Sequence, residues 1–223
     1  RPLVPRGPAW QSKQSPYIVW RHFSRGMDIP LSKVRIINPY IGGGFSGKQD
    51  PFDLDFAAVK LAMKTGRPVK IVHTQEEVLA TQRQRHSKKA WFKLGVKRDG
   101  TLVALDCRLI AEGGAYACVS AGNLQVFGSG LLMPYRLPNI KYEGIRVYTN
   151  LPPCGAVRGQ SLVIARYMFE RILDMVADDL GLDQYEIRLK NAYRVGDVTP
   201  SGMHIENWDF VACLEKAAEG IGW

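Results

Sequence analysis

The residues most able to do chemistry form a glycine loop at positions 42–49, which reads GGGFSGKQ. Four of the first six residues of this loop are glycine. Glycine loses more conformational entropy on folding than any other residue, so this density predicts positive φ angles or a backbone that something approaches closely. Exposed backbone N–H groups in such a loop can cradle an anionic or oxo group.

The residues alone leave three interpretations of the loop open. The GxxxxGK spacing fits a phosphate-binding P-loop, but Gln49 stands where that motif has a magnesium-binding Ser or Thr. The GxGxxG spacing fits a dinucleotide fingerprint, but the first acidic residues after the next predicted strand, Glu76 and Glu77, come about 30 residues later rather than about 20. The third interpretation is a tight turn without a ligand.

The remaining reactive side chains give weaker signals. The four cysteines are widely spaced without a CxxC pair, which argues against a zinc site or a disulfide scaffold and favours a reducing, cytoplasmic compartment. The four histidines show no metal-ligand spacing. Glu76 and Glu112 lie in no motif that would make either a general base.

Hydrophobic periodicity, together with glycine, proline and capping residues, predicts the helices and strands that position the loop. A strand at 34–37 delivers the loop, a helix from Phe52 to Met63 follows it, and a strand at 69–72 completes a predicted βαβ unit. A helix at 16–27, with Ser15 as N-cap, precedes the unit, and a short helix is predicted at 76–81.

The second half begins with two long strands that meet at Asp99-Gly100, the strongest hairpin signal in the chain, with Val103, Leu105, Cys107 and Leu109 on one face. Residues 113–130 are irregular and predict a loop or a short helix. A strand at 140–148 and a helix at 164–180 follow. The expected buried positions of that helix are Tyr167, Ile172, Val176 and Leu180, and two further helices are predicted at 184–191 and 209–218.

Length and composition limit the class of protein and the partners that can be expected. The chain has 223 residues, 46% of them hydrophobic, and a net charge of +9. These values predict a globular protein with anionic partners, and no apolar run is long enough to span a membrane. No recognition motif accompanies the charge, so nucleic acid is not an expected partner. Residues 1–9 form a proline-rich arm or a protease-site remnant, and the main region divides into halves at about 10–82 and 83–223.

A second unusual loop decides among these interpretations. Residues 148–159 read YTNLPPCGAVRG, and together with Trp10 to Gln14 and the glycine loop they resemble the molybdenum-binding subunit of the xanthine dehydrogenase and aldehyde oxidase family in order and spacing. The resemblance covers about Trp10 to Trp223, and residues 148–158 look most like 4-hydroxybenzoyl-CoA reductase and related bacterial members. It implies an α+β molybdopterin-binding domain with mixed sheets and packed helices, and a chain that is a fragment of a longer subunit.

Site residues carry over position by position from this resemblance. Gln14, which lies 31 residues before Phe45, matches the catalytic glutamine whose amide hydrogen-bonds to an oxygen ligand of molybdenum. Arg158 matches the arginine of the second cofactor loop, whose guanidinium can donate several hydrogen bonds to an anion or pterin. The cofactor-binding set that the resemblance implies is Gln14, Gly43, Gly44, Phe45, Ser46, Gly47, Ala156, Val157, Arg158 and Gly159. No protein side chain is expected to ligate the metal directly.

The resemblance also carries expectations about substrate and partners. Gln49 replaces a glutamate of purine-hydroxylating members and Gln160 replaces an aromatic residue, which argues against purine and leaves another aromatic or heteroaromatic ring, an aldehyde or a CoA thioester. The implied cofactor is molybdenum-molybdopterin in the cytosine dinucleotide form. A 2Fe-2S subunit, an FAD subunit and the rest of the molybdenum subunit, which carries the general-base glutamate, complete a hetero-oligomer. The alternative from a different class is a basic interaction module without turnover.

Overall fold

The computed structural model describes residues 7–85, 87–118 and 120–223. Residues 1–6 of the predicted N-terminal arm lie outside this range. The chain divides into two compact units, one made of Arg1–Arg85 with Gly155–Arg158 and the other of His86–Cys154 with Gly159–Trp223. A short stretch of the second loop therefore belongs to the first unit, although most of the loop belongs to the second.

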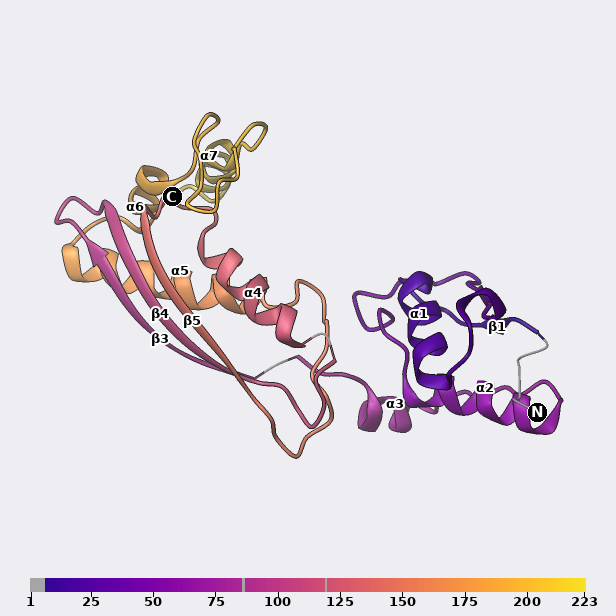
Figure 1. Ribbon diagram of the computed structural model, residues 1–223. Coiled ribbons are helices and arrows are strands. Elements are labelled where there is room, and N and C mark those ends of the chain that lie inside the picture. The colour runs from indigo at the N-terminus through magenta and orange to yellow at the C-terminus, as the bar shows by residue number, and fades with distance from the viewer. Residues whose placement is uncertain (1–6, 86, 119) are drawn as a thin grey trace. The chain divides into compact units, whose positions relative to one another are not determined.

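The first unit is small and helical, with one short parallel ladder (Figure 1). The ladder pairs Ala9 with Ile36 and Trp10 with Ile37. Helices α1 and α2 pack through an edge-to-face contact between Phe23 and Phe56, whose ring centroids are 5.0 Å apart. The elements of this unit are β1 (Ala9–Trp10), α1 (Pro16–Met27), the 3-10 turn η1 (Leu31–Lys33), β2 (Ile36–Ile37), α2 (Asp53–Thr65) and α3 (Gln75–Thr81).

The predicted helices of this unit are confirmed, but the predicted strand at 69–72 is wrong. Ser15 occupies the N-cap position of α1 without a side-chain capping bond, and Gly66 ends α2 in the left-handed conformation with φ of 67°. Residues 69–72 belong to no strand, and the Val72 side chain is 71% exposed. An extended segment becomes a strand only when a neighbour completes its ladder. No described segment does so here, so the loop lies between a strand and a helix rather than in a complete βαβ unit.

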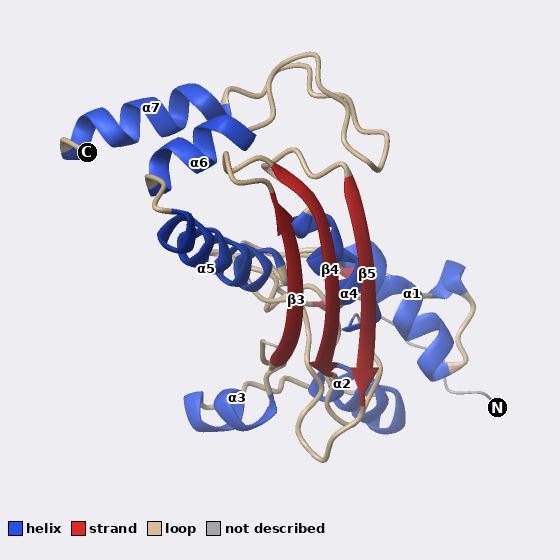
Figure 2. Ribbon diagram, turned by 90° about the vertical axis from the view of Figure 1, so that its left-hand side faces the viewer, coloured by secondary structure: helices blue, strands red, loops and turns tan. Residues whose placement is uncertain are grey.

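The second unit is built on a three-stranded mixed sheet in the order β3-β4-β5 (Figure 2). β3 pairs antiparallel with β4 through the predicted turn at Asp99-Gly100, and β4 pairs parallel with β5. Parallel neighbours need a crossover, which α4 provides. The elements of this unit are β3 (Lys88–Val96), β4 (Leu102–Glu112), α4 (Ser120–Leu131), β5 (Asn139–Val147), α5 (Leu162–Leu180), α6 (Gln184–Asn191) and α7 (Phe210–Ile221).

Helices α4 and α5 cover one face of the sheet and form the main core with it (Figure 2). Leu105, Cys107 and Leu109 of β4 are buried there, as predicted. Val103 is only partly buried because a register shift beside Gly95 and Val96 pairs Val96 with Leu102 and places Leu102 in the core instead. Burial also raises the pKa of the Cys107 thiol to about 12, so this cysteine is a packing residue rather than a nucleophile.

The buried stripe of α5 differs from the prediction. Its buried residues are Ala165, Phe169, Leu173 and Ala177, four residues apart. Of the four positions expected in the core, Ile172 and Val176 are partly buried, whereas Tyr167 is 71% and Leu180 37% exposed. The buried stripe combines two alanines, a phenylalanine and a leucine, so large aliphatic side chains alone do not mark the inner face of the helix.

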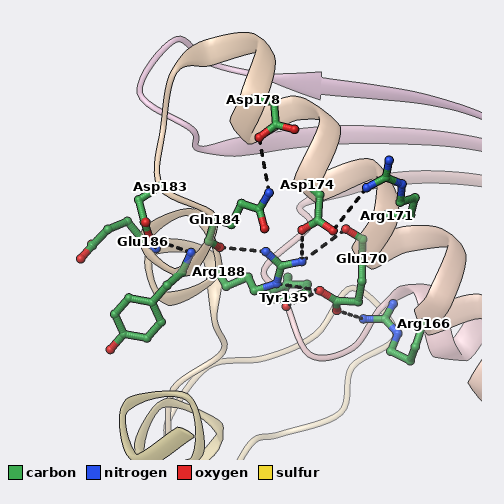
Figure 3. A network of polar contacts seen from close by, with 11 residues as sticks. Tyr135, Arg166, Glu170, Arg171, Asp174, Asp178, Asp183, Gln184, Glu186 and Arg188 are labelled. Carbon is green, nitrogen blue, oxygen red and sulfur yellow. Dashed lines mark hydrogen bonds and ion pairs between the residues drawn. The ribbon is translucent and has the colours of Figure 1, made fainter. Parts of the chain in front are cut away.

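A polar network joins α5 to α6 (Figure 3). Arg188 donates from Nε to Glu170 at 2.9 Å and from Nη2 to Asp174 at 2.6 Å, and Tyr135 donates to Glu170 at 3.0 Å. Burial, with the neighbouring Glu170 carboxylate, raises the pKa of Tyr135, which keeps its hydroxyl available as a donor. The network accounts for the orientation of α6 without involving a predicted site residue.

Candidate functional site

The glycine loop closes in a tight turn that holds an aromatic side chain in solvent. Gly47 N donates to Gly44 O at 2.8 Å, and the two residues between them, Phe45 and Ser46, have φ of 47° and 73°. Positive φ at both central positions is the signature of a type I′ turn, which favours Gly, Asn or Asp. Such a conformation costs a non-glycine residue about 1–3 kcal/mol and is often found at functional sites. Phe45 is nevertheless 65% exposed, so core packing does not explain why it is held there.

Lys48 fastens the base of the loop. Its ammonium donates to Ser12 Oγ at 3.0 Å and to the Ile41 carbonyl. The Lys48 carbonyl accepts the Gln14 N–H at 2.9 Å. Lys48 therefore holds the loop against the segment from Ser12 to Gln14, and its ammonium is engaged within the protein instead of pointing to a nucleotide phosphate.

Side-chain hydrogen bonds hold the backbone of residues 11–14 beyond the end of the short ladder. After β2 ends, the Asn38 carboxamide takes the place of a paired strand residue: its Oδ1 accepts the Lys13 N–H and its Nδ2 donates to the Lys13 carbonyl, both at 2.8 Å. In this segment Gln11 and Lys13 are buried, while Gln14, at the bend that follows, is exposed. The two bonds between Lys13 and Asn38 fix the backbone that leads into Gln14.

Gln14 lies directly against Gly44. A Cβ atom at position 44 would sit 2.4 Å from Gln14 Cδ, so only glycine leaves room for this side chain. Among the hydrogen bonds of the described residues, none involves the Gln14 carboxamide. The amide therefore rests on bare backbone with its N–H groups and oxygen available to a ligand.

The second loop brings Arg158 to the same turn. Gly155 N donates to Gln84 O at 3.1 Å, and Arg85 Nη2 donates to the Arg158 carbonyl at 2.8 Å. These bonds hold residues 155–158 beside the end of α3. The Arg158 guanidinium lies 5.1 Å from the centroid of the Phe45 ring, a cation–π contact, and has no ion pair with a described residue.

The structure thus joins Gln14, Gly44, Phe45 and Arg158 in one series of contacts within the first unit. Gly43, Ser46 and Gly47 complete the turn, Ala156 is buried and Val157 partly buried behind Arg158, and Gln49 follows the turn with its N–H on Ser46 O. Gly159 and Gln160 belong to the second unit, with φ of 72° and 42°. Gln14, Phe45 and Arg158 are exposed.

Hollows elsewhere do not compete with this site. Two of about 620 and 580 Å³ are lined by residues of the second unit alone, and neither includes a predicted site residue. Among the described residues, no group of three or more His, Cys, Asp or Glu side chains could hold a metal ion. No helix in the described part of the chain is long and apolar enough to cross a membrane.

Comparison with known families gives this geometry its context. Residues 7–192 match the family model of the molybdopterin cofactor-binding domain. The chain belongs to this family. The predicted membership in the xanthine dehydrogenase and aldehyde oxidase group, and the predicted fold class, are confirmed.

Individual relatives of the molybdopterin-binding domain agree with this assignment. The chain is 38% identical over 95% of its length to the xanthine dehydrogenase molybdenum-binding subunit of Escherichia coli O157:H7, of which it covers 28%. It is 34% identical over 89% of its length to the nicotinate dehydrogenase large molybdopterin subunit of Eubacterium barkeri, of which it covers 48%. Among solved structures, aldehyde oxidoreductase from Desulfovibrio gigas matches 95% of this chain and 23% of its own with a TM-score of 0.86 and 26% identity. The chain therefore spans from 23% to 48% of the length of these proteins.

The residues of this molybdopterin-binding domain fit a metallopterin in their chemistry. The Gln14 carboxamide and the Arg158 guanidinium, which make no hydrogen bond or ion pair with another described residue, can donate to oxo, phosphate or pterin acceptors. The bare backbone at Gly44 lets the Gln14 carboxamide lie against the turn.

The sequence interpretation missed the residues that support this site. Asn38, Lys48 and Arg85 fix the backbone around it, but each acts on a segment at least 25 residues away in the chain, from Lys13 to Asn38 at the shortest. No local spacing signals such contacts.

Proposed function

We propose that this chain forms part of the cofactor site of a molybdenum hydroxylase, an oxidoreductase that acts on a small molecule. The observation that carries the proposal is the contact series from Gln14 through Gly44 and Phe45 to Arg158, in which an amide and a guanidinium without hydrogen bonds to other described residues lie beside a strained, exposed turn. A tight turn without a ligand would not explain why a phenylalanine occupies a left-handed conformation in solvent.

The cofactor that fits is molybdenum-molybdopterin, and when bound it supplies the two-electron redox chemistry of the reaction. The Gln14 carboxamide would donate a hydrogen bond to an oxygen of this group. Arg158 would donate to an anionic or carbonyl oxygen of the pterin portion, while the Phe45 ring holds the guanidinium plane. Gly43, Gly44 and Gly47 keep the turn free of side chains, and Ala156, Val157 and Gly159 carry the second loop. Such fixed donors stabilise developing charge without reorganisation.

The substrate is proposed to be an aromatic or heteroaromatic ring, an aldehyde or a CoA thioester. Gln49 and Gln160 are neutral side chains that can donate and accept hydrogen bonds, so this chain offers hydrogen bonding rather than charge at the positions proposed to face substrate. The name of one relative, nicotinate dehydrogenase, supports a heteroaromatic substrate. The general-base glutamate is proposed to lie in another segment of the polypeptide.

The electron path is proposed to run to 2Fe-2S clusters and FAD on partner subunits of a cytoplasmic hetero-oligomer. The pterin is proposed to carry a cytosine dinucleotide. The names of relatives as molybdenum-binding or molybdopterin subunits support an assembly of several chains.

Replacement of Arg158 tests the proposal. In the complete polypeptide, Arg158→Ala should lower molybdenum and pterin content by about 10-fold or more, and Arg158→Lys should recover only part of it, since lysine lacks the planar donor fork. Metal analysis and pterin fluorescence measure the content. Arg25→Ala, at an exposed arginine in the last turn of α1, is the matched control and should keep full content. Wild-type molybdenum content in the Arg158→Ala protein would remove Arg158 from the site.

A further inference from the structure

Two cations, Lys13 and Arg83, lie over the ring of Phe52 at the start of α2, and the carboxylates of Asp55 and Asp50 pair with them. Lys13 Nζ lies 4.5 Å and Arg83 Cζ 4.7 Å from the ring centroid. Lys13 pairs with Asp55 at 2.7 Å and donates to the Asp50 carbonyl at 3.1 Å. Arg83 donates to the Pro51 carbonyl at 2.8 Å and lies 3.9 Å from the Asp50 carboxylate.

The pair of Lys13 and Asp55 is almost completely buried, with side-chain exposures of 6% and 10%. A buried ion pair gains little stability over an apolar pair of similar size, because desolvation offsets the attraction. Such a pair does impose direction, since each donor must reach its acceptor. Asp55 Oδ2 is doubly committed, because it also accepts the Phe52 N–H at 2.7 Å and so caps α2.

Three members of this cluster, Lys13, Asp50 and Arg83, adjoin the proposed site, either in the chain or by packing. Lys13 directly precedes Gln14, and the Lys13 side chain is buried whereas Gln14 is exposed. Asp50 and Pro51 directly follow the glycine loop. Arg83 packs against Gly155, where a Cβ atom would sit 2.7 Å from the Arg83 side chain, at the start of the segment that carries Arg158.

We propose that Lys13 is a positioning residue, whose buried ammonium, held by Asp55 and the Asp50 carbonyl, fixes the place of the Gln14 carboxamide beside the glycine loop. The identity of the ligand that Gln14 contacts rests on the proposed function. The anchoring of Gln14 by Lys13 does not depend on it. Without the ammonium, Lys13 loses its bonds to Asp55 and the Asp50 carbonyl, so its side chain no longer anchors the segment, which keeps only its bonds to residues 37–48.

The test compares Lys13→Met with the double variant Lys13→Met/Asp55→Asn in the complete polypeptide. Lys13→Met leaves the Asp55 carboxylate buried without a cation and should lower the thermal midpoint. The double variant removes that unpaired charge, while the oxygen of the new carboxamide can still accept the Phe52 N–H, so its thermal midpoint should return most of the way. Asp53→Asn, an exposed neutralisation in the first turn of the same helix, is the control.

Two further measurements separate positioning from simple stabilisation. Hydrogen exchange of the peptide covering residues 9–15, in protein free of cofactor, should be faster in both Lys13 variants than in the wild type and the control. Molybdenum and pterin content should fall about 10-fold in both, the lower end of the effect typical for outer-shell partners. The double variant is thus expected to recover thermal stability, but not the slow hydrogen exchange of residues 9–15 or the cofactor content.

Two outcomes would overturn the inference that Lys13 positions Gln14. If the double variant recovers wild-type exchange and cofactor content, the cluster serves stability alone and the inference is overturned. Unchanged exchange and content in a folded Lys13→Met protein would overturn it as well. A wild-type protein without molybdenum or pterin would tell against the proposed function, whereas the exchange comparison would still decide whether Lys13 anchors Gln14. If Lys13→Met does not fold, the double variant alone supplies the decision.

Discussion

Gln14 lies against Gly44 in the proposed site, and the pair shows how a missing side chain can make room for another. The space that a Cβ atom would take is filled by the Gln14 carboxamide, at 2.4 Å from the ideal Cβ position to Cδ. Real Cβ atoms do not approach other atoms so closely, and the backbone of both residues is fixed, Gln14 by its bond to the Lys48 carbonyl. A substitution at position 44 must therefore move the Gln14 side chain.

A double-mutant cycle checks this relation. Gly44→Ala should reduce turnover of the assembled enzyme about as much as Gln14→Ala, on the order of 10-fold or more, because both remove the same donor. In the Gln14→Ala background, Gly44→Ala should have almost no further effect, since residues that act through one contact are not additive. Steady-state turnover per molybdenum measures both. Additive losses would mean that Gly44 acts on the site independently of Gln14.

The residues of the proposed site could be named from the sequence because the family resemblance rests on local motifs. The glycine loop and the second loop each read as a continuous string, and the structure brings Phe45 and Arg158 within 5.1 Å. Their supports could not be predicted. The pairing of Lys13 with Asp55 joins segments more than 40 residues apart, and a lysine in an otherwise polar stretch is more often solvated than buried.

At the scale of the element, the least predictable part is α4. Its sequence, SAGNLQVFGSGL, contains three glycines, which lower helix propensity and made residues 113–130 look irregular. Packing explains two of them. A Cβ atom at Gly128 would lie 2.7 Å from the Tyr142 ring of β5, and one at Gly130 would lie 2.9 Å from Leu162 of α5. Tertiary contacts therefore override low helix propensity in α4. The strand predicted at 69–72 shows the reverse case, because its local pattern favours a strand but no described segment pairs with it.

The glycines of α4 provide a matched pair of substitutions. Gly128→Ala should destabilise the protein by about 1–3 kcal/mol, the usual range for overpacking, because the new methyl group meets a ring that is itself fixed by the bond from Tyr142 Oη to the Leu124 carbonyl. Gly122→Ala, in the same helix with nothing within 4 Å, should stabilise it by about 0.5–1 kcal/mol. Urea unfolding measures both. Two stabilising substitutions would show that α4 does not pack on β5 as described.

At the scale of the whole molecule, the two units differ in how they are held together. The second unit has one continuous core of β4, α4 and α5. The large buried apolar side chains among the described residues of the first unit are Val19, Phe23 and Ile29, and buried Lys13, Asp50 and Asp55 accompany them. Apolar burial provides most of the driving force for folding, so the unit that contains the proposed site has the weaker core. Binding sites are often drawn from such less stable regions.

Hydrogen exchange with and without cofactor should show this difference. In protein from cells that cannot make the pterin, peptides from α1 and α2 should exchange faster than those from β4 and α5, because local opening of a weaker core costs less. A ligand stabilises the state that binds it, by about 4 kcal/mol at a thousandfold excess over its dissociation constant. Loading with cofactor should therefore slow exchange most at residues 9–15, 42–49 and 155–158, with little change in β4. Protection confined to the second unit would place the ligand away from Gln14 and Arg158, whereas protection at these three segments requires that they share one ligand.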